Sequence, residues 1–90
     1  MKCHKKVVIR GRVQGVWFRK YAKDKADGFG LSGYVKNEFD GTVYIEVSGE
    51  NEQVNTFIQW CHAGPPLAHV ETVEVNENDV HHKDGFSIKN

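Results

Sequence analysis

Hydrophobic and polar residues alternate near the start of the chain, over residues 5–13. Val7, Ile9 and Val13 fall on one side of an extended backbone, and the arginines between them fall on the other. This period of two predicts a half-buried strand. Further along, apolar residues recur every three or four positions, which is typical of one face of a helix. Gly28 or Gly30 is expected to end that helix. Its apolar positions are Phe18, Ala22, Ala26 and Phe29.

A turn signal separates the next two predicted strands. Residues 31–38 form the first of them, with Val35 facing inward and Tyr34 and Lys36 facing outward. Asp40-Gly41 follows and is typical of a hairpin turn. The alternation resumes over residues 42–47 and predicts a third strand. Its inner positions are Val43, Ile45 and Val47.

A second helix is expected to begin at Asn51, a residue type that caps helices well. The helix should end at Gly64-Pro65-Pro66, because proline cannot continue it. Three valines then predict a fourth strand with a β-bulge where the alternation slips. Phe86 and Ile88 suggest a short final strand. The helical stripe is Val54, Phe57, Ile58 and Cys61, and the valines are Val70, Val73 and Val75.

The order of these elements is βαββαβ, with a possible additional edge strand. It predicts an α+β fold, a ferredoxin-like sandwich whose antiparallel sheet of four or five strands has both helices on one face. A helix joins the first two strands, which therefore run parallel with the third strand between them. Their carboxyl ends lie at the same edge of the sheet, so Asn37 and the loop after Val13 are expected to meet there.

Length and charge restrict the possible functions. A chain of 90 residues is one domain at most and has no room for a deep cavity, so we expect one domain over residues 1–90 with its site in a surface loop. Basic and acidic residues balance at 12 each, which argues against broad nucleic-acid binding but allows a local anion site. We also expect a monomer without a signal peptide or membrane span. Cys3 and Cys61 suggest no disulfide framework, which favours the reducing cytoplasm.

The loop between the first strand and the first helix is the candidate site. No Ser, Thr, Asp or Asn occurs over residues 14–19, so the first helical turn lacks a side-chain cap. An anion can satisfy the free backbone N–H groups, and Gly15 allows a close approach. Arg19 adds a planar fork suited to phosphate oxygens. The residues leave open an ordinary loop capped by water, with Arg19 solvated.

Other candidate residues have simpler interpretations. The histidines lack the spacing of a metal site and are expected to be solvated at the surface. Cys61 lies on the second helical stripe and is expected in the core. Tyr34 and Tyr44 are expected to pair across two strands on the open face, where some ferredoxin-like proteins bind RNA. The RNA-binding signature is absent. The histidines are His4, His62, His69, His81 and His82.

Two motifs make the sequence similar to a known family. Residues 11–19, GRVQGVWFR, closely resemble the first acylphosphatase motif, Gly-x-Val-Gln-Gly-Val-x-Phe-Arg. Residues 33–37, GYVKN, with DGTV at 40–43, resemble the second motif. The resemblance extends over nearly the whole chain. Trp17 occupies a position that is often smaller in the family, and residues 27–30 are richer in glycine than usual.

The resemblance implies a metal-independent acylphosphatase without a cofactor. It implies that Arg19 binds the phosphoryl oxygens and that Asn37 orients the attacking water. It also implies a phosphate cradle formed by the backbone N–H groups of Gly15, Val16, Trp17, Phe18 and Arg19. The substrate would be a small acyl phosphate, and inorganic phosphate would be both product and competitive inhibitor. Two alternatives remain: a non-catalytic anion-binding or regulatory module, and a role for Asn37 in starting the turn at Asp40-Gly41.

Overall fold

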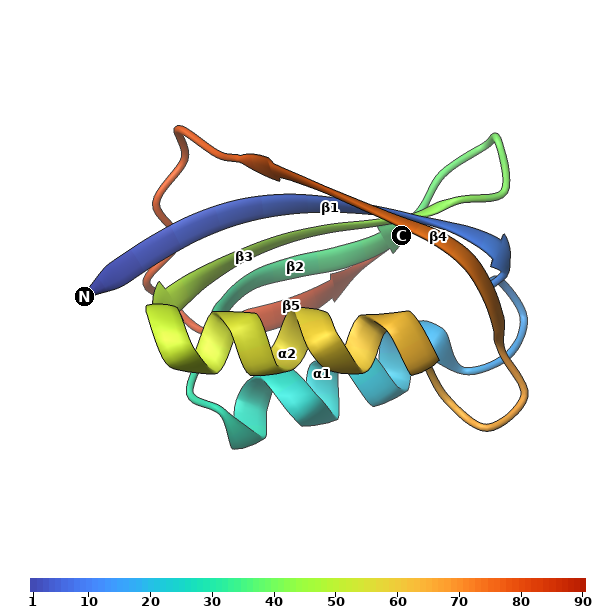
Figure 1. Cartoon of the computed structure of the whole chain (residues 1–90), viewed down its shortest axis with the longest axis horizontal. Coiled ribbons are helices and arrows are strands. Elements are labelled where there is room, and N and C mark those ends of the chain that lie inside the picture. The colour runs from blue at the N-terminus through green and yellow to red at the C-terminus, as the bar shows by residue number, and fades with distance from the viewer.

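Two helices lie side by side on one face of a five-stranded sheet in the computed structural model, which describes residues 1–90 (Figure 1). The elements follow the predicted order βαββαβ with one further strand, which confirms the ferredoxin-like α+β fold. They are β1 (Lys2–Arg12), α1 (Phe18–Gly28), β2 (Ser32–Asn37), β3 (Val43–Glu50), α2 (Asn51–Ala63), β4 (His69–Glu77) and β5 (Phe86–Lys89).

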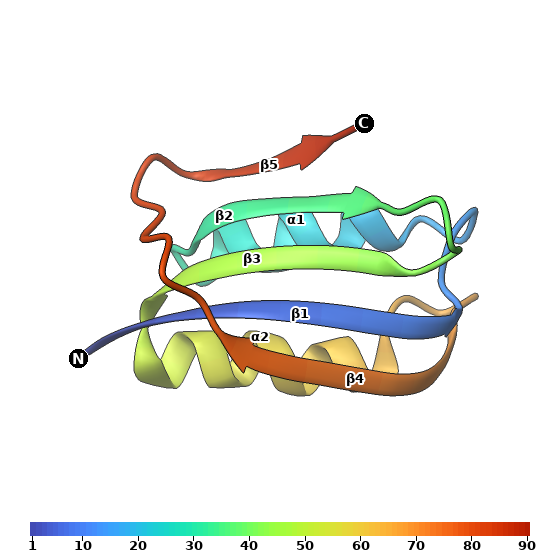
Figure 2. The same cartoon turned by 90° about the horizontal axis from the view of Figure 1, so that it is seen from above.

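Strand β3 lies between β1 and β2 and pairs antiparallel with both, in the sheet order β4-β1-β3-β2-β5. β1 and β2 therefore run parallel, as predicted, and end at the same edge of the sheet (Figure 2). The prediction of a wholly antiparallel sheet is wrong for the last strand, because β5 pairs with β2 in parallel. After β4 the chain crosses the open face at the end where β2 begins, so β5 runs beside β2 in the same direction (Figure 2).

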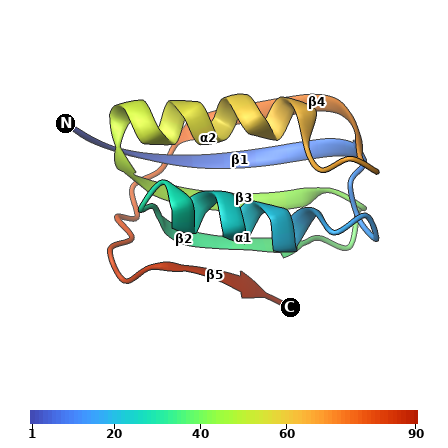
Figure 3. The same ribbon diagram turned by 90° about the horizontal axis from the view of Figure 1, so that it is seen from below.

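The core lies between the sheet and the two helices. α2 packs against β4, β3 and β1, and α1 packs against β2 and β5. The two helices lie side by side on this face of the sheet (Figure 3). The buried side of α1 consists of Phe18, Ala22 and Ala26, as the periodicity predicts. The strands contribute inward residues that are fully buried. Those strand residues are Val7, Ile9, Val35, Val43, Ile45 and Val47.

Helix α2 begins at Asn51, as predicted, but Asn51 is not its N-cap. Asn51 is the first helical residue, and Glu50 is the N-cap, with φ −62° and ψ 139° and no side-chain cap. The reason is the neighbouring strand, because the backbone N–H of Asn51 donates to the carbonyl of Met1 at 2.8 Å. A tertiary contact thus satisfies the first free N–H of the helix, and no side chain caps the helix. Neither α1 nor α2 has the length and apolar composition of a membrane-spanning helix.

The predicted β-bulge in β4 is present. The register of β1 against β4 shifts between Arg10, opposite Thr72, and Gly11, opposite Val70, which leaves Glu71 as the extra residue. Gly11 has φ +130°, and a Cβ there would collide with the carbonyl of His69. The bulge therefore requires glycine at this position of β1.

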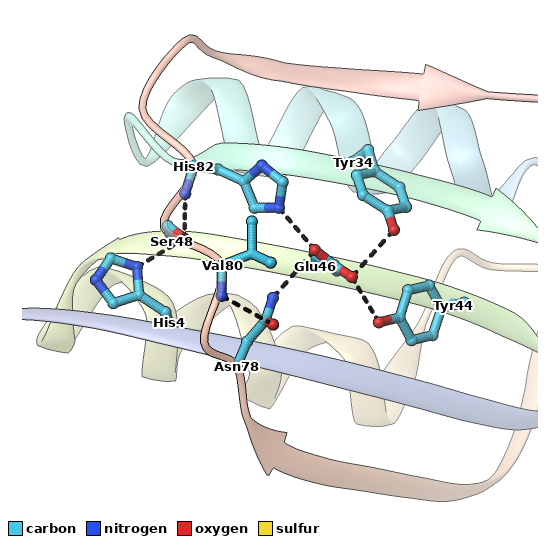
Figure 4. A network of polar contacts seen from close by, with 8 residues as sticks. All are labelled: His4, Tyr34, Tyr44, Glu46, Ser48, Asn78, Val80 and His82. Atoms are coloured by element: carbon cyan, nitrogen blue, oxygen red, sulfur yellow. Dashed lines mark hydrogen bonds and ion pairs between the residues drawn. The ribbon is translucent and has the colours of Figure 1, made fainter.

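A polar network on the open face corrects the prediction for the histidines. His62, His69 and His81 are exposed, but His4 and His82 are half-buried. The ring of His4 stacks on His81, with centroids 3.6 Å apart. The centre of the network is Glu46, whose carboxylate accepts hydrogen bonds from four side chains (Figure 4). The donors are Tyr34 at 3.0 Å, Tyr44 at 2.7 Å, Asn78 at 3.0 Å and His82 at 2.7 Å.

This network joins the sheet to the crossing segment between β4 and β5. Asn78 and His82 belong to that segment, while Tyr34 and Tyr44 form the predicted cross-strand pair, with centroids 6.1 Å apart. Burial alone would raise the pKa of Glu46, but the four hydrogen bonds outweigh it and lower the pKa to about 2. The carboxylate therefore stabilises the folded state in its ionised form.

The lowered pKa of Glu46 predicts a specific pH dependence of stability. Its contribution is complete above about pH 4.5, the ordinary pKa, and is lost as the pH falls toward about 2. At pH 7 we expect Glu46→Gln to cost about 1–2 kcal/mol, which lowers Tm by roughly 5–15 °C. The difference between variant and wild type should shrink by more than half at pH 3.

Thermal melts at pH 7 and pH 3 provide the measurement. Glu74→Gln is a matched control, since the exposed Glu74 lies 4.0 Å from Arg10 and should contribute little at either pH. An equal loss of Tm for Glu46→Gln at both pH values would contradict the ionic role of the network.

Candidate active site

The loop between β1 and α1 leaves the first helical turn without a side-chain cap, as predicted. Trp17 is the N-cap and makes no side-chain cap hydrogen bond. The backbone N–H of Tyr21 donates to the carbonyl of Trp17 at 3.0 Å, so the N–H groups before Tyr21 have no partner within the helix. The first turn also contains no acidic residue. The positive end of the helix dipole is therefore available to an anion.

The conformation of this loop is unusual for its residues. Gly15 has φ +74°, and Trp17 has φ +68° and ψ 20°, in the left-handed region. Trp17 is the only residue other than glycine with a positive φ. A bulky residue in this region costs on the order of 1–3 kcal/mol, and such strain often occurs at functional sites. The indole is also 68% exposed, so burial of the side chain offsets little of that cost.

Gln14 fixes the loop against the end of β2. Its side-chain Nε2 donates to the carbonyl of Glu38 at 2.8 Å and to the carbonyl of Thr42 at 2.9 Å. Both carbonyls belong to the turn between β2 and β3, where Asp40 accepts hydrogen bonds from the backbone N–H and the hydroxyl of Thr42. The uncapped helix start is therefore held at a fixed position relative to Asn37.

Asn37 is the last residue of β2 and pairs with Val43 of β3. Its Oδ1 is buried and has no hydrogen-bond partner in the protein. A buried acceptor in this state is costly unless a water or ligand donates to it. Asp40, and not Asn37, makes the side-chain bonds that shape the turn. The geometry therefore does not favour a turn-forming role for Asn37.

Arg19, the second residue of α1, is half-buried beside the same space. One Nη atom donates to Oδ1 of Asn90 at 3.4 Å, a long contact that leaves most of the guanidinium donors available. Lys20 is adjacent, but its ammonium pairs with Asp24 at 3.1 Å on the helix surface. Arg19 is therefore the cation best placed to bind an anion here.

These residues surround a cavity of about 520 Å³ at the carboxyl ends of β1 and β2. No carboxylate side chain lines it, and no group of three or more His, Cys, Asp or Glu residues in the protein could hold a metal ion. The lining combines cationic, amide and apolar groups, which suits an organic phosphate. The lining residues are Val13, Gly15, Trp17, Phe18, Arg19, Lys20, Asn37, Ile88 and Asn90.

Comparison with known proteins identifies the family. A model of the acylphosphatase family matches residues 5–88. The chain belongs to the acylphosphatase family. An acylphosphatase from a Nocardioides species is 47% identical over 83 residues, which cover 92% of this chain and 84% of that protein.

Solved acylphosphatase structures agree with this assignment. The Coxiella burnetii enzyme has a TM-score of 0.93 at 33% identity, with 98% of this chain and 93% of that chain covered. The Bacillus subtilis enzyme has a TM-score of 0.90 at 34% identity, with both chains covered completely.

As an acylphosphatase, the chain is a hydrolase that cleaves the carboxyl–phosphate bond of acyl phosphates. The products are a carboxylate and inorganic phosphate. None of these relatives supports the alternative of a non-catalytic binding module. This confirms the resemblance that the two sequence motifs indicated.

The structure brings together most of the residues that the sequence singled out. Gly15, Trp17, Phe18, Arg19 and Asn37 all line the cavity. The side chain of Val16 instead packs in the core, with 7% of its surface exposed, so only its backbone could contribute to a phosphate cradle.

Sequence reasoning missed three contributors to the site. Ile88 and Asn90 line the cavity because β5 pairs with β2, a pairing that the sequence pattern does not determine. The double hydrogen bond of Gln14 was also missed. The sequence did contain a signal for this clamp. Gln14 is an amide side chain beside glycine, in a loop that has few other hydrogen-bonding side chains, and such an amide can bind backbone carbonyls.

The clamp predicts that Gln14→Ala loosens the loop. Loss of two hydrogen bonds should reduce stability by about 1–2 kcal/mol. A loop displaced from Asn37 should also lose about tenfold in kcat/KM, because catalysis depends on positioning. Acyl phosphate hydrolysis and thermal melts test both effects, with Gln59→Ala on the exposed side of α2 as the control. A lower Tm with unchanged kcat/KM would show that the clamp stabilises the protein without positioning the site.

Proposed function

We propose that Arg19 and Asn37 perform the hydrolysis by direct in-line attack of water on the phosphorus of the acyl phosphate. The observation that supports this most is that Asn37, whose buried Oδ1 has no partner in the protein, lines the same cavity as Arg19 and the uncapped start of α1. Arg19 and the start of α1 would thus bind the anion, and Asn37 would accept a hydrogen bond from a water.

The phosphoryl group would bind at the start of α1. Backbone N–H groups from Gly15 to Arg19, including those of Val16, Trp17 and Phe18, would donate to its oxygens, assisted by the helix dipole. The guanidinium of Arg19 would grip two oxygens through parallel N–H bonds. Because these donors are fixed before the substrate arrives, they stabilise the charge of the transition state at no reorganisation cost.

Asn37 would hold the attacking water. Its side-chain Oδ1 can accept one water O–H, which directs a lone pair of that water toward phosphorus. An amide cannot act as a general base, and the reaction does not require a strong one. A loose phosphoryl-transfer transition state depends mainly on positioning and charge stabilisation.

The reaction balances without a further reactant. The water oxygen forms a bond to phosphorus as the bond from phosphorus to the acyl oxygen breaks. The electron pair of that bond leaves with the carboxylate, which is a weak base that needs little protonation because the pKa of its conjugate acid is about 4. Both water protons end on the phosphate product. No metal or cofactor takes part in this proposal.

Several further properties belong to the same proposal. Inorganic phosphate has the same oxygens as the phosphoryl group and should therefore inhibit competitively. Every residue named for the reaction comes from one copy of the chain, which supports a monomer, and the single core cluster supports one domain over residues 1–90. Two free cysteines support the cytoplasm.

Arg19 should be required for phosphate binding. We expect Arg19→Ala to lose nearly all activity and to weaken competitive inhibition by inorganic phosphate. Arg19→Lys should also be poor, because a point charge cannot replace a bidentate grip. Steady-state hydrolysis of an acyl phosphate with added inorganic phosphate measures both effects. Arg10→Ala, an exposed arginine on the open face, is the control. Near-normal turnover by Arg19→Lys would contradict the bidentate geometry.

Asn37 should act mainly in the transition state. We expect Asn37→Ala to keep its fold and its phosphate affinity but to lose at least about a hundredfold in kcat. Measurements of kcat, phosphate affinity and Tm test this, with the exposed Asn55→Ala as the control. A lower Tm with unchanged kcat would identify a structural residue. Loss of phosphate binding together with activity would instead assign Asn37 to the anion cradle.

A further inference from the structure

Trp17 has a conformation that the fold itself does not explain. Its left-handed backbone is one that glycine and asparagine adopt with little strain, and its indole lies mostly in solvent. Neither the packing of the core nor the cap of α1 uses the side chain. A smaller residue would form the same loop with less strain. The presence of tryptophan therefore points to a role in the cavity that it lines.

The cavity is larger than the phosphoryl group requires. A phosphoryl group with its bridging oxygen has five heavy atoms and, at about 30 Å³ per heavy atom as in water, would fill on the order of 150 Å³. The cavity measures about 520 Å³, within the range typical of small-molecule sites. Most of the space therefore remains for the acyl group.

The remaining wall is apolar and partly aromatic. Trp17 and Ile88 line the same cavity as Arg19 and Asn37, and Ile88 is 38% exposed. The side chain of Phe18 is 2% exposed and packs in the core, so it contributes little to this wall. The N–H group and the indole of Trp17 come from one residue. A phosphoryl group bound at the start of α1 therefore shares the cavity with the indole, and the acyl group must extend along this apolar wall or into solvent.

We infer that Trp17 determines acyl-group specificity and that the enzyme prefers aromatic acyl phosphates, whose ring stacks on the indole. This inference rests on the proposed function, because the phosphoryl group must bind beside Arg19 for the ring to reach Trp17. Stacked aromatic rings contribute binding free energy beyond that of the buried area alone. The contact is remote from the bond that breaks, so it should strengthen ground-state and transition-state binding alike and should change KM more than kcat.

Steady-state kinetics with benzoyl phosphate and acetyl phosphate test the inference. For the wild type we expect KM to be about threefold to tenfold lower for benzoyl phosphate. Trp17→Asn tolerates the left-handed backbone and removes the aromatic plane, so the ratio of the two KM values should fall toward one. Trp17→Phe should retain most of the ratio. Any disturbance of the N–H cradle affects both substrates and cancels in the ratio.

One control variant separates the effect of Trp17 from that of other aromatic residues near the site, and one stability measurement tests the strain at Trp17. Tyr21→Ala removes an aromatic side chain of α1 that is 40% exposed and does not line the cavity, so it should keep the wild-type ratio. The Tm of Trp17→Asn should equal or exceed that of the wild type, because the substitution relieves strain. An unchanged KM ratio in Trp17→Asn, or no preference in the wild type, would overturn the inference.

A binding experiment separates failure of this inference from failure of the proposed function. Benzylphosphonate and methylphosphonate are not hydrolysed, and their binding can be followed by the fluorescence of Trp17 against the constant signal of Trp60. We expect the wild type to bind benzylphosphonate more tightly than methylphosphonate. Trp17→Asn lacks the fluorescent side chain, so its binding is measured by calorimetry, and it should bind the two ligands equally. Equal binding of both by the wild type overturns the inference even if hydrolysis is normal. If Asn37→Ala loses hydrolysis but still binds benzylphosphonate more tightly than methylphosphonate, the aromatic wall is supported whether or not Asn37 orients the water.

Discussion

The pairing of β3 between β1 and β2 is the constraint on which the site depends. It makes β1 and β2 parallel and places their carboxyl ends at one edge of the sheet. The uncapped start of α1 follows β1, and Asn37 ends β2, so the anion-binding and acceptor groups come from different elements of the same frame. Gln14 connects the two by hydrogen bonds to the turn after β2. The buried valines and isoleucines of these strands therefore determine the geometry of the site, although none of them has chemical function.

Polar groups are distributed very differently on the two sides of the sheet. The side that faces the helices is apolar and is fully buried at the central strands, whereas the open face contains a charged group, Glu46, with four hydrogen-bond donors. Since two of those donors lie in the segment between β4 and β5, the network also holds β5 at the far edge of the sheet. β5 in turn contributes Ile88 to the cavity. Polar contacts on the open face thus support an apolar part of the site at the sheet edge.

The site itself lacks the groups that many hydrolases use. No nucleophile or carboxylate side chain lines the cavity, which contains one well-placed guanidinium, free backbone N–H groups and the amides of Asn37 and Asn90. In the proposed reaction this small set would be sufficient, because the leaving group is already a stable anion and the protein has only to position the reactants and balance charge. The strained backbone at Trp17 belongs to the same loop, as expected where a backbone must present its N–H groups to a ligand.

The sequence by itself determined the elements, the order of the fold and the two motif residues, Arg19 and Asn37. The elements and their order depend on local periodicity and turn residues, which are visible along the chain. The roles proposed for Arg19 and Asn37 come from the resemblance of two motifs to those of the family. Only the tertiary structure decided the parallel pairing of β5, the N-cap at Glu50 and the burial of His82. Each of these depends on a contact between residues far apart in sequence. Such contacts leave no periodic pattern, because an edge strand or a crossing segment can be polar and still dock wherever its hydrogen-bond partners lie.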